Sequence, residues 1–121
     1  MIDSISIQFS QVDLTNPAAR TWIKNIIKDN LVTEGRAGGW MHDFGEYTPF
    51  DAVFFDGSDP VVYHNQYAHD WAIVCREALD EVPGGDQIVP WMRSGAALSP
   101  KDARLFWMGD QLLTYDKYDG M

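Results

Sequence analysis

The sequence predicts an α/β fold with a parallel sheet. Short apolar segments alternate with helical segments along its 121 residues, and the helical segments are long enough to connect parallel strands. Each candidate strand ends at a charged residue: Asp13, Asp43, Arg93 or Asp110. Because the reacting groups of α/β barrels follow the carboxyl ends of their strands, this rhythm indicates part of a (β/α)8 barrel wall. A whole barrel needs about 250 residues, so we expect an incomplete TIM barrel, roughly half of one.

The N-terminal segment predicts a strand followed by a helix. Residues 4–14 begin with an apolar side chain at every second position, a period typical of a strand. Residues 15–35 then follow a helical period, with Asn16 as the expected N-cap, Pro17 in the first helical position and Gly35 as the stop. The expected apolar face of this helix consists of Trp22, Ile23, Ile26 and Ile27.

The middle of the chain predicts a strand, a long loop and a second helix. Residues 38–43 are a short strand candidate. The aromatic, Gly- and Pro-containing residues 44–60 are too long and irregular for a simple turn, which favours a functional loop. Over residues 63–82 the apolar side chains follow a helical period, and residues 83–85, Pro-Gly-Gly, end it.

Two further strands are expected towards the C-terminus, at residues 87–94 and 103–110. Pro90 has no N–H to donate to a sheet ladder, so we expect a bulge or a strand end there. No internal repeat, low-complexity tract or linker interrupts the chain. Residues 1–121 are therefore expected to belong to one domain.

Charge and composition exclude several classes of partner. Nine Lys and Arg against 18 Asp and Glu give a net charge of −9, which leaves no basic surface for nucleic acid or an anionic membrane. No apolar run approaches the roughly 18 residues of a spanning helix, and the start "MIDSISIQFS" lacks the layout of a secretory signal. We expect a cytoplasmic location unless the N-terminus is truncated. Cys75 is expected to be a small buried hydrophobe, and nothing indicates an oligomeric state.

Four segments together carry a resemblance to a known family. "GGWMHDFGEYTPFD", "FFDGSDPVVYHNQYAHDW", "WMRSG" and "FWMGDQ" resemble the catalytic barrel of glycoside hydrolase family 31, in the order and spacing of that family. The D-F-G-E and M-G-D-Q forms resemble the sulfoquinovosidases of the family most closely. The second segment also resembles its bacterial α-xylosidases, whereas the common α-glucosidases carry Asn where Gly45 stands.

The resemblance implies a retaining α-glycoside hydrolase of carbohydrate metabolism, with Asp43 as nucleophile and Asp110 as general acid/base. It implies that residues 1–121 form a partial catalytic barrel, with about the fourth to sixth strands and the end of the third. The residues that grip a sulfonate would then lie mostly elsewhere in the barrel. The expected substrate-binding side chains are Arg93, which corresponds to the family arginine beside the −1 sugar, Trp107, Trp40, Phe44 and His42, and the expected supporting side chains are Glu46 and Gln111.

The chemistry of retaining glycosidases explains why two distant acids matter. Such enzymes hold two carboxyl groups roughly 5 to 5.5 Å apart, one to attack the anomeric carbon and one to shuttle the proton. Two acids at the tips of nearby parallel strands can adopt this arrangement, provided that Asp43 is ionised and the pKa of Asp110 is raised. Glu46 lies only three residues after Asp43, which makes it an implausible second catalytic acid. We expect it to orient the catalytic groups through hydrogen bonds instead.

Less specific interpretations stay open at this point. Asp43 could cap a turn, Arg93 could be an ordinary surface charge, and Trp40, Phe44 and Trp107 could be plain core residues. We expect no metal, since the spacing of His64 and His69 fits no recognised site, and no cofactor, since no glycine segment continues as a nucleotide-binding fingerprint. The expected partner is an α-glycoside. The alternative is an inactive fragment that acts only in binding or association, because an incomplete barrel exposes strand edges.

Overall fold

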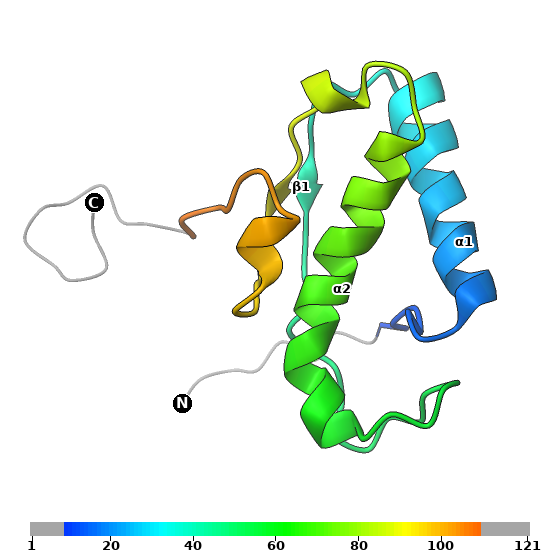
Figure 1. The fold of residues 1–121 in the computed structure, drawn as a ribbon, viewed down its shortest axis with the longest axis vertical. Helices are drawn as coiled ribbons and strands as arrows, with labels where there is room; N and C mark the ends of the chain where they lie inside the picture. Colours follow the sequence, from blue (N-terminus) through cyan, green and yellow to red (C-terminus); the bar gives the residue numbers. More distant parts are fainter. Residues whose placement is uncertain (1–8, 110–121) are drawn as a thin grey trace, which may run out of the picture.

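The computed structural model describes residues 9–109, in which a long helix lies between a second helical segment and a small parallel sheet (Figure 1). Within these residues no helix is both long and apolar enough to cross a membrane. The elements follow one another as α1 (Pro17–Ile26), η1 (Ile27–Glu34), β1 (Met41–His42), α2 (Pro60–Asp80), η2 (Gly85–Gln87), β2 (Trp91–Met92) and η3 (Ser99–Lys101).

The first helical segment confirms the expected start and stop. Asn16 caps α1 through its side-chain oxygen, which accepts hydrogen bonds from the N–H groups of Ala18 and Ala19. Helix α1 continues without a break into the π-helix η1, which ends just before Gly35. The expected apolar face is wrong in one position: Ile27 is buried, but the Trp22 side chain is 56% exposed. At about 100° per residue, Trp22 lies roughly 140° around the helix from the buried Ile27, which places it towards solvent.

Helix α2 begins three residues earlier than the expected 63–82 and ends at Asp80. Asp59 is its N-cap and accepts a hydrogen bond from the Val61 N–H, while Pro60 occupies the first turn, where no N–H is needed. The sequence places Asp59 and Pro60 in the expected loop, whereas in the structure they begin the helix. The loop that remains, residues 43–59, contains no helix or strand, as expected.

The sheet is parallel, as expected, but its strands are much shorter than the segments 38–43, 87–94 and 103–110. Met41 pairs with Trp91 and His42 with Met92, and a single parallel bridge joins Met92 to Phe106. Hydrogen bonds from the Val89 and Trp91 N–H groups to the carbonyls of Gly38 and Trp40 extend the contact without completing a longer ladder. Pro90 lies between those two donors, and a donor at its position would face the other edge, where the Met92 N–H binds the Leu105 carbonyl, so Pro90 limits pairing with the third segment.

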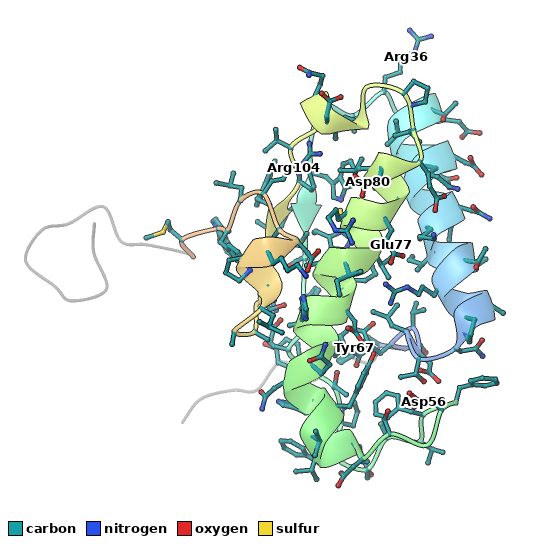
Figure 2. The ribbon with its side chains drawn as sticks, viewed as in Figure 1. Arg36, Asp56, Tyr67, Glu77, Asp80 and Arg104 are labelled. Carbon is teal, nitrogen blue, oxygen red and sulfur yellow. The ribbon has the colours of Figure 1, made fainter. Side chains whose placement is uncertain are left out.

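The strand expected over residues 4–14 is not formed in its described part, since residues 9–14 contain no strand. Residues 4–8 of the expectation lie outside the described residues. The segment is held instead by side chains: the Tyr67 hydroxyl donates to the Val12 carbonyl at 2.9 Å, and Figure 2 shows Tyr67 on α2 near this segment. Alternation alone therefore did not produce a strand where no neighbouring strand pairs with it.

Helix α2 packs on both sides. One cluster joins it to α1, η1 and the preceding segment, and consists of Leu14, Ile27, Tyr63, Tyr67, Val74 and Ala78. A second joins it to the sheet through Ala72, Cys75 and Met92. Cys75 is fully buried, as expected, and burial raises the pKa of its thiol to about 12. Glu77 points from α2 towards α1 in Figure 2, where it accepts hydrogen bonds from Arg20. These contacts fix the helix behind the sheet edge that carries the candidate site.

Candidate active site at the carboxyl edge of the sheet

Asp43 and Arg93 meet directly after β1 and β2. Because the two strands are parallel and in register, the residues that follow them emerge at the same edge. The Arg93 Nε lies 3.2 Å from the Asp43 Oδ1, and the Phe44 N–H donates to the same oxygen at 2.9 Å. The other carboxylate oxygen, Oδ2, accepts no hydrogen bond within residues 9–109. The carboxylate is thus held by one oxygen and leaves the second available.

Arg93 is held between two carboxylates and two aromatic rings. Its Nη2 donates a hydrogen bond to Glu46 Oε1, and its Cζ lies 4.1 Å from the centroid of the Phe44 ring and 5.7 Å from that of Tyr47. Burial alone would lower the pKa of Arg93, but the hydrogen bond that it donates to Glu46 and the charges of Glu46 and Asp43 raise this pKa above its ordinary value. Glu46 Oε2 is buried and lacks a partner in the described part of the chain.

The turn after Asp43 has an unusual backbone. Phe44 has a φ of 60°, in the left-handed region that non-glycine residues rarely adopt, and Gly45 follows with a φ of 112°. A Cβ at Gly45 would come 2.6 Å from the Ser94 Oγ. The Asp43–Phe44 peptide unit directs the Phe44 N–H onto the Asp43 carboxylate, and the left-handed Phe44 that follows has its ring beside the Arg93 guanidinium.

Two side chains from other elements bind the carbonyls of that turn. The Trp71 Nε1–H, from α2, donates to the Asp43 carbonyl at 3.0 Å. The Ser94 hydroxyl, two residues after β2, donates to the Phe44 carbonyl at 2.5 Å. Consecutive carbonyls are therefore each satisfied by a different element, which restrains the turn from both sides.

His42 is buried beneath this turn, with 4% of its surface exposed. Its ring stacks on that of Trp71 at a centroid distance of 3.9 Å. The Trp40 Nε1–H donates to His42 Nδ1, so His42 Nε2 carries the proton and donates to the Trp71 carbonyl at 3.2 Å. Burial lowers the pKa of His42 from 6.5 to about 4, although the hydrogen bond to Trp71 opposes this shift. The ring is therefore neutral at pH 7.

We expect protein stability to decrease on acidification because of His42. Its pKa is about 4 in the folded state and 6.5 in the unfolded state, so the unfolded chain takes up the proton first. The stabilisation is complete above pH 6.5 and is lost as the pH falls towards 4, by about 3 kcal/mol over the whole window. Urea unfolding between pH 8 and pH 4 measures this. A His42→Gln variant should lack this component, and an undiminished pH slope in that variant would contradict it.

The other expected site residues differ in where they lie. Trp40 packs against both core clusters, which favours the core alternative that its sequence context left open. Trp107 is half-buried. Its backbone N–H donates to the Met92 carbonyl at 2.9 Å, directly after the bridge between Met92 and Phe106. Phe44 is 48% exposed and presents a ring to solvent. Asp110 and Gln111 lie outside the described residues.

Sequence reasoning missed Trp71, Ser94 and Tyr47. Trp71 belongs to a helix whose apolar period suggested only core packing, and nothing local marks its indole N–H as a donor to the turn. Ser94 follows Arg93 directly in the W-M-R-S-G segment, which was a usable signal. Tyr47 follows Glu46 in the glycine-containing loop, at 53% exposure.

The histidines outside the turn are engaged in structural contacts. His64 Nδ1 lies 2.6 Å from the Thr48 carbonyl oxygen. His69 Nε2 lies 2.8 Å from one carboxylate oxygen of Asp102, and the other oxygen of Asp102 pairs with Arg76. Among residues 9–109 no group of three or more His, Cys, Asp or Glu side chains could hold a metal ion.

One cleft, of about 530 Å³, lies away from Asp43 between the first half of α2 and the segment before η3. Its walls are mostly apolar, and none of the expected site residues contributes to them. The lining residues are Ser58, Asp59, Val62, Tyr63, Asn65, Gln66, His69, Ala96, Ala97 and Leu98. The carboxylate and arginine at the sheet edge are therefore the stronger candidate for chemistry.

Comparison with known proteins gives a consistent result. A family model described as the glycosyl hydrolases family 31 TIM-barrel domain matches residues 4–120. The sulfoquinovosidase of Escherichia coli K12 is 41% identical over 110 residues, 91% of this chain and 16% of the relative. The α-xylosidase XylQ of Lactiplantibacillus pentosus is 36% identical over 84 residues, 69% of this chain and 11% of the relative.

A solved structure matches as well. It is a family 31 sulfoquinovosidase from E. rectale in complex with an aza-sugar inhibitor, with a TM-score of 0.73 and 42% identity over 82% of this chain and 15% of that one. The chain thus spans about one sixth of the length of the sulfoquinovosidases that it matches. Together with the parallel strand order, these matches identify a TIM-barrel fragment.

Proposed function

The chain belongs to glycosyl hydrolase family 31, and from this premise we propose that it supplies part of the catalytic site of a retaining α-glycoside hydrolase. Asp43 is the nucleophile and Asp110 the general acid/base. Arg93 binds sugar hydroxyls beside the nucleophile, and Phe44 and Trp107 offer aromatic faces to the ring. Residues 1–121 are one part of a catalytic barrel, with about its fourth to sixth strands and the end of the third.

The single observation that carries this proposal is the state of the Asp43 carboxylate. One of its oxygens is held by Arg93 and by the Phe44 N–H, and the other is without a hydrogen-bond donor among residues 9–109. A nucleophile needs this arrangement, since one oxygen must be fixed and the other must reach the anomeric carbon. In the same part of the chain Asp59 also caps a helix through one oxygen alone, so what favours a nucleophile is the free oxygen together with the place of Asp43 directly after β1 and beside Arg93.

The favoured substrate is an α-sulfoquinovoside. Two relatives named as sulfoquinovosidases, at 41% and 42% identity, support it, and they cover 91% and 82% of this chain. The α-xylosidase relative, at 36% identity over 69% of the chain, supports an α-xyloside as the alternative. An α-glucoside is the third candidate, against which the glycine at position 45 argues. In each case the reaction and its two carboxylates are the same.

A barrel chimera tests the proposal. The matching segment of the E. coli sulfoquinovosidase is replaced by this chain, and the E. rectale enzyme serves as a second host. We expect hydrolysis of an aryl α-sulfoquinovoside with retention of anomeric configuration. Because the hosts supply most of the residues expected to grip the sulfonate, slower hydrolysis of the corresponding α-xyloside and α-glucoside would reflect the hosts, so the test bears on the reaction and its two carboxylates. Two chimeras that unfold cooperatively yet hydrolyse none of the three would refute the proposal. Turnover by the 121-residue chain alone would exclude the inactive-fragment alternative.

Glu46→Gln should weaken catalysis through Arg93. The charge-assisted hydrogen bond from Arg93 Nη2 to Glu46 Oε1 fixes the guanidinium, and such bonds contribute about 1.5–3 kcal/mol. We expect kcat/KM of the chimera to fall about tenfold. Glu34→Gln is the matched control, because Glu34 is exposed at the end of η1 and away from this edge. Equal kinetics for the two variants would show that Glu46 does not act on Arg93.

A further inference from the structure

The turn that bears Asp43 is restrained by groups to which the proposed function assigns no part. The Asp43 carbonyl accepts the Trp71 indole N–H at 3.0 Å, and the Phe44 carbonyl accepts the Ser94 hydroxyl at 2.5 Å. Both carbonyls belong to a backbone that enters the left-handed region at Phe44 and continues at a φ of 112° at Gly45. Such a conformation persists only when its surroundings hold it.

Trp71 is itself fixed by two contacts with His42, and His42 is fixed in turn by Trp40. Its ring stacks on His42 at 3.9 Å, its own carbonyl accepts the His42 Nε2–H at 3.2 Å, and His42 Nδ1 accepts the Trp40 indole N–H at 3.3 Å. The hydrogen bonds therefore run from Trp40 through His42 and Trp71 to the Asp43 carbonyl. Helix α2, on the outside of the sheet, thereby sets the position of a turn at the carboxyl edge of the strands.

We propose that Trp71 and Ser94 are positioning residues that aim the Asp43 carboxylate. Resting on the proposed nucleophilic role of Asp43, this inference concerns residues that do not touch the sugar. While both donors are in place, the Phe44 N–H points at Asp43 Oδ1 at 2.9 Å and the Phe44 ring lies 4.1 Å from Arg93 Cζ. The Asp43 carbonyl and the Phe44 N–H belong to one planar peptide unit, so loss of the Trp71 donor lets this unit rotate and takes the N–H away from Oδ1. Loss of the Ser94 hydroxyl releases the Phe44 carbonyl, and with it the left-handed conformation that keeps this peptide unit and the Phe44 ring in place.

Trp71→Phe and Ser94→Ala in the barrel chimera test this. Phe keeps a ring against His42 but has no N–H, and Ala removes only the hydroxyl. We expect each variant to lower kcat and the rate of covalent labelling by a 5-fluoro glycosyl fluoride about tenfold, with KM changed less than about twofold. In the double variant, the fold-decrease in kcat should be smaller than the product of the two single fold-decreases, because both donors hold the same turn.

Matched controls separate positioning from general stability. Trp22→Phe makes the same change at a 56% exposed tryptophan, and Ser10→Ala makes it at an exposed serine. Normal labelling rates for Trp71→Phe and Ser94→Ala, below their unfolding temperatures, would overturn the inference even if both variants unfold earlier. If Trp71→Phe fails to fold, Ser94→Ala decides alone. An inactive unsubstituted chimera would instead refute the proposed function, so the two failures are distinct.

Discussion

Asp43→Asn in the barrel chimera should lower kcat about 10⁴-fold or more, because an amide cannot attack the anomeric carbon. The substitution keeps the size of the side chain and leaves an oxygen that can still accept the hydrogen bonds from Arg93 and the Phe44 N–H. Folding and substrate affinity should therefore change little, so the loss appears in kcat rather than in KM. Steady-state kinetics with an aryl α-glycoside measure this.

The stereochemistry of rescue identifies the role of Asp43 more sharply than the rate. In Asp43→Ala, azide can enter the space of the carboxylate and attack from the same face, which yields a glycosyl azide of inverted configuration. Asp51→Asn is the matched control, since Asp51 is exposed in the same loop, and it should keep full activity. Substantial turnover by Asp43→Asn would remove Asp43 from the mechanism, and so would rescue with retained configuration.

The meeting of Asp43 and Arg93 could be predicted because it depends on very little of the fold. Both residues directly follow short apolar segments, and two parallel strands in register deliver their next residues to one edge. No knowledge of strand length was needed. Helix α1 was predictable for a similar reason, since the Asn16 cap, Pro17 and Gly35 are all local signals.

Strand lengths could not be predicted, because pairing depends on neighbours and not on alternation. Residues 9–14 continue an alternating segment but form no strand, and the ladder between β1 and β2 is limited to Met41–His42 and Trp91–Met92. The start of α2 was missed for a different reason: Asp59 and Pro60 are typical of both loops and helix starts.

The contacts that hold the turn at Asp43 could not be predicted from the sequence either. Trp71 lies 28 residues after Asp43, and its hydrogen bond to the Asp43 carbonyl depends on how α2 rotates against the sheet. A left-handed Phe44 is equally unexpected, since glycine, at the next position, is the usual residue for a positive φ. Contacts between distant elements decide both features, and no local pattern encodes them.

Asp110→Asn should separate substrates by their leaving groups. Asp110 lies outside the described residues, but it follows the segment whose Trp107 N–H donates to Met92 beside β2. As general acid, it protonates an oxygen that leaves poorly on its own, so kcat/KM for alkyl α-glycosides should fall about 10²–10⁴-fold. An aryl glycoside with an acidic phenol needs little protonation, so its kcat/KM should fall much less. The alkaline limb of the pH profile, which reports a general acid, should disappear.

Azide again gives the decisive readout, with the opposite stereochemistry from Asp43→Ala. In Asp110→Ala the glycosyl-enzyme still forms on Asp43, and azide attacks it from the face that the leaving group vacated, so the product retains its configuration. Asp29→Asn, at an exposed position of η1, is the control and should leave both substrate classes unaffected. Equal losses for aryl and alkyl substrates would contradict proton donation by Asp110. Opposite products from the two variants would assign one carboxylate to each face of the sugar, as a double-displacement mechanism requires.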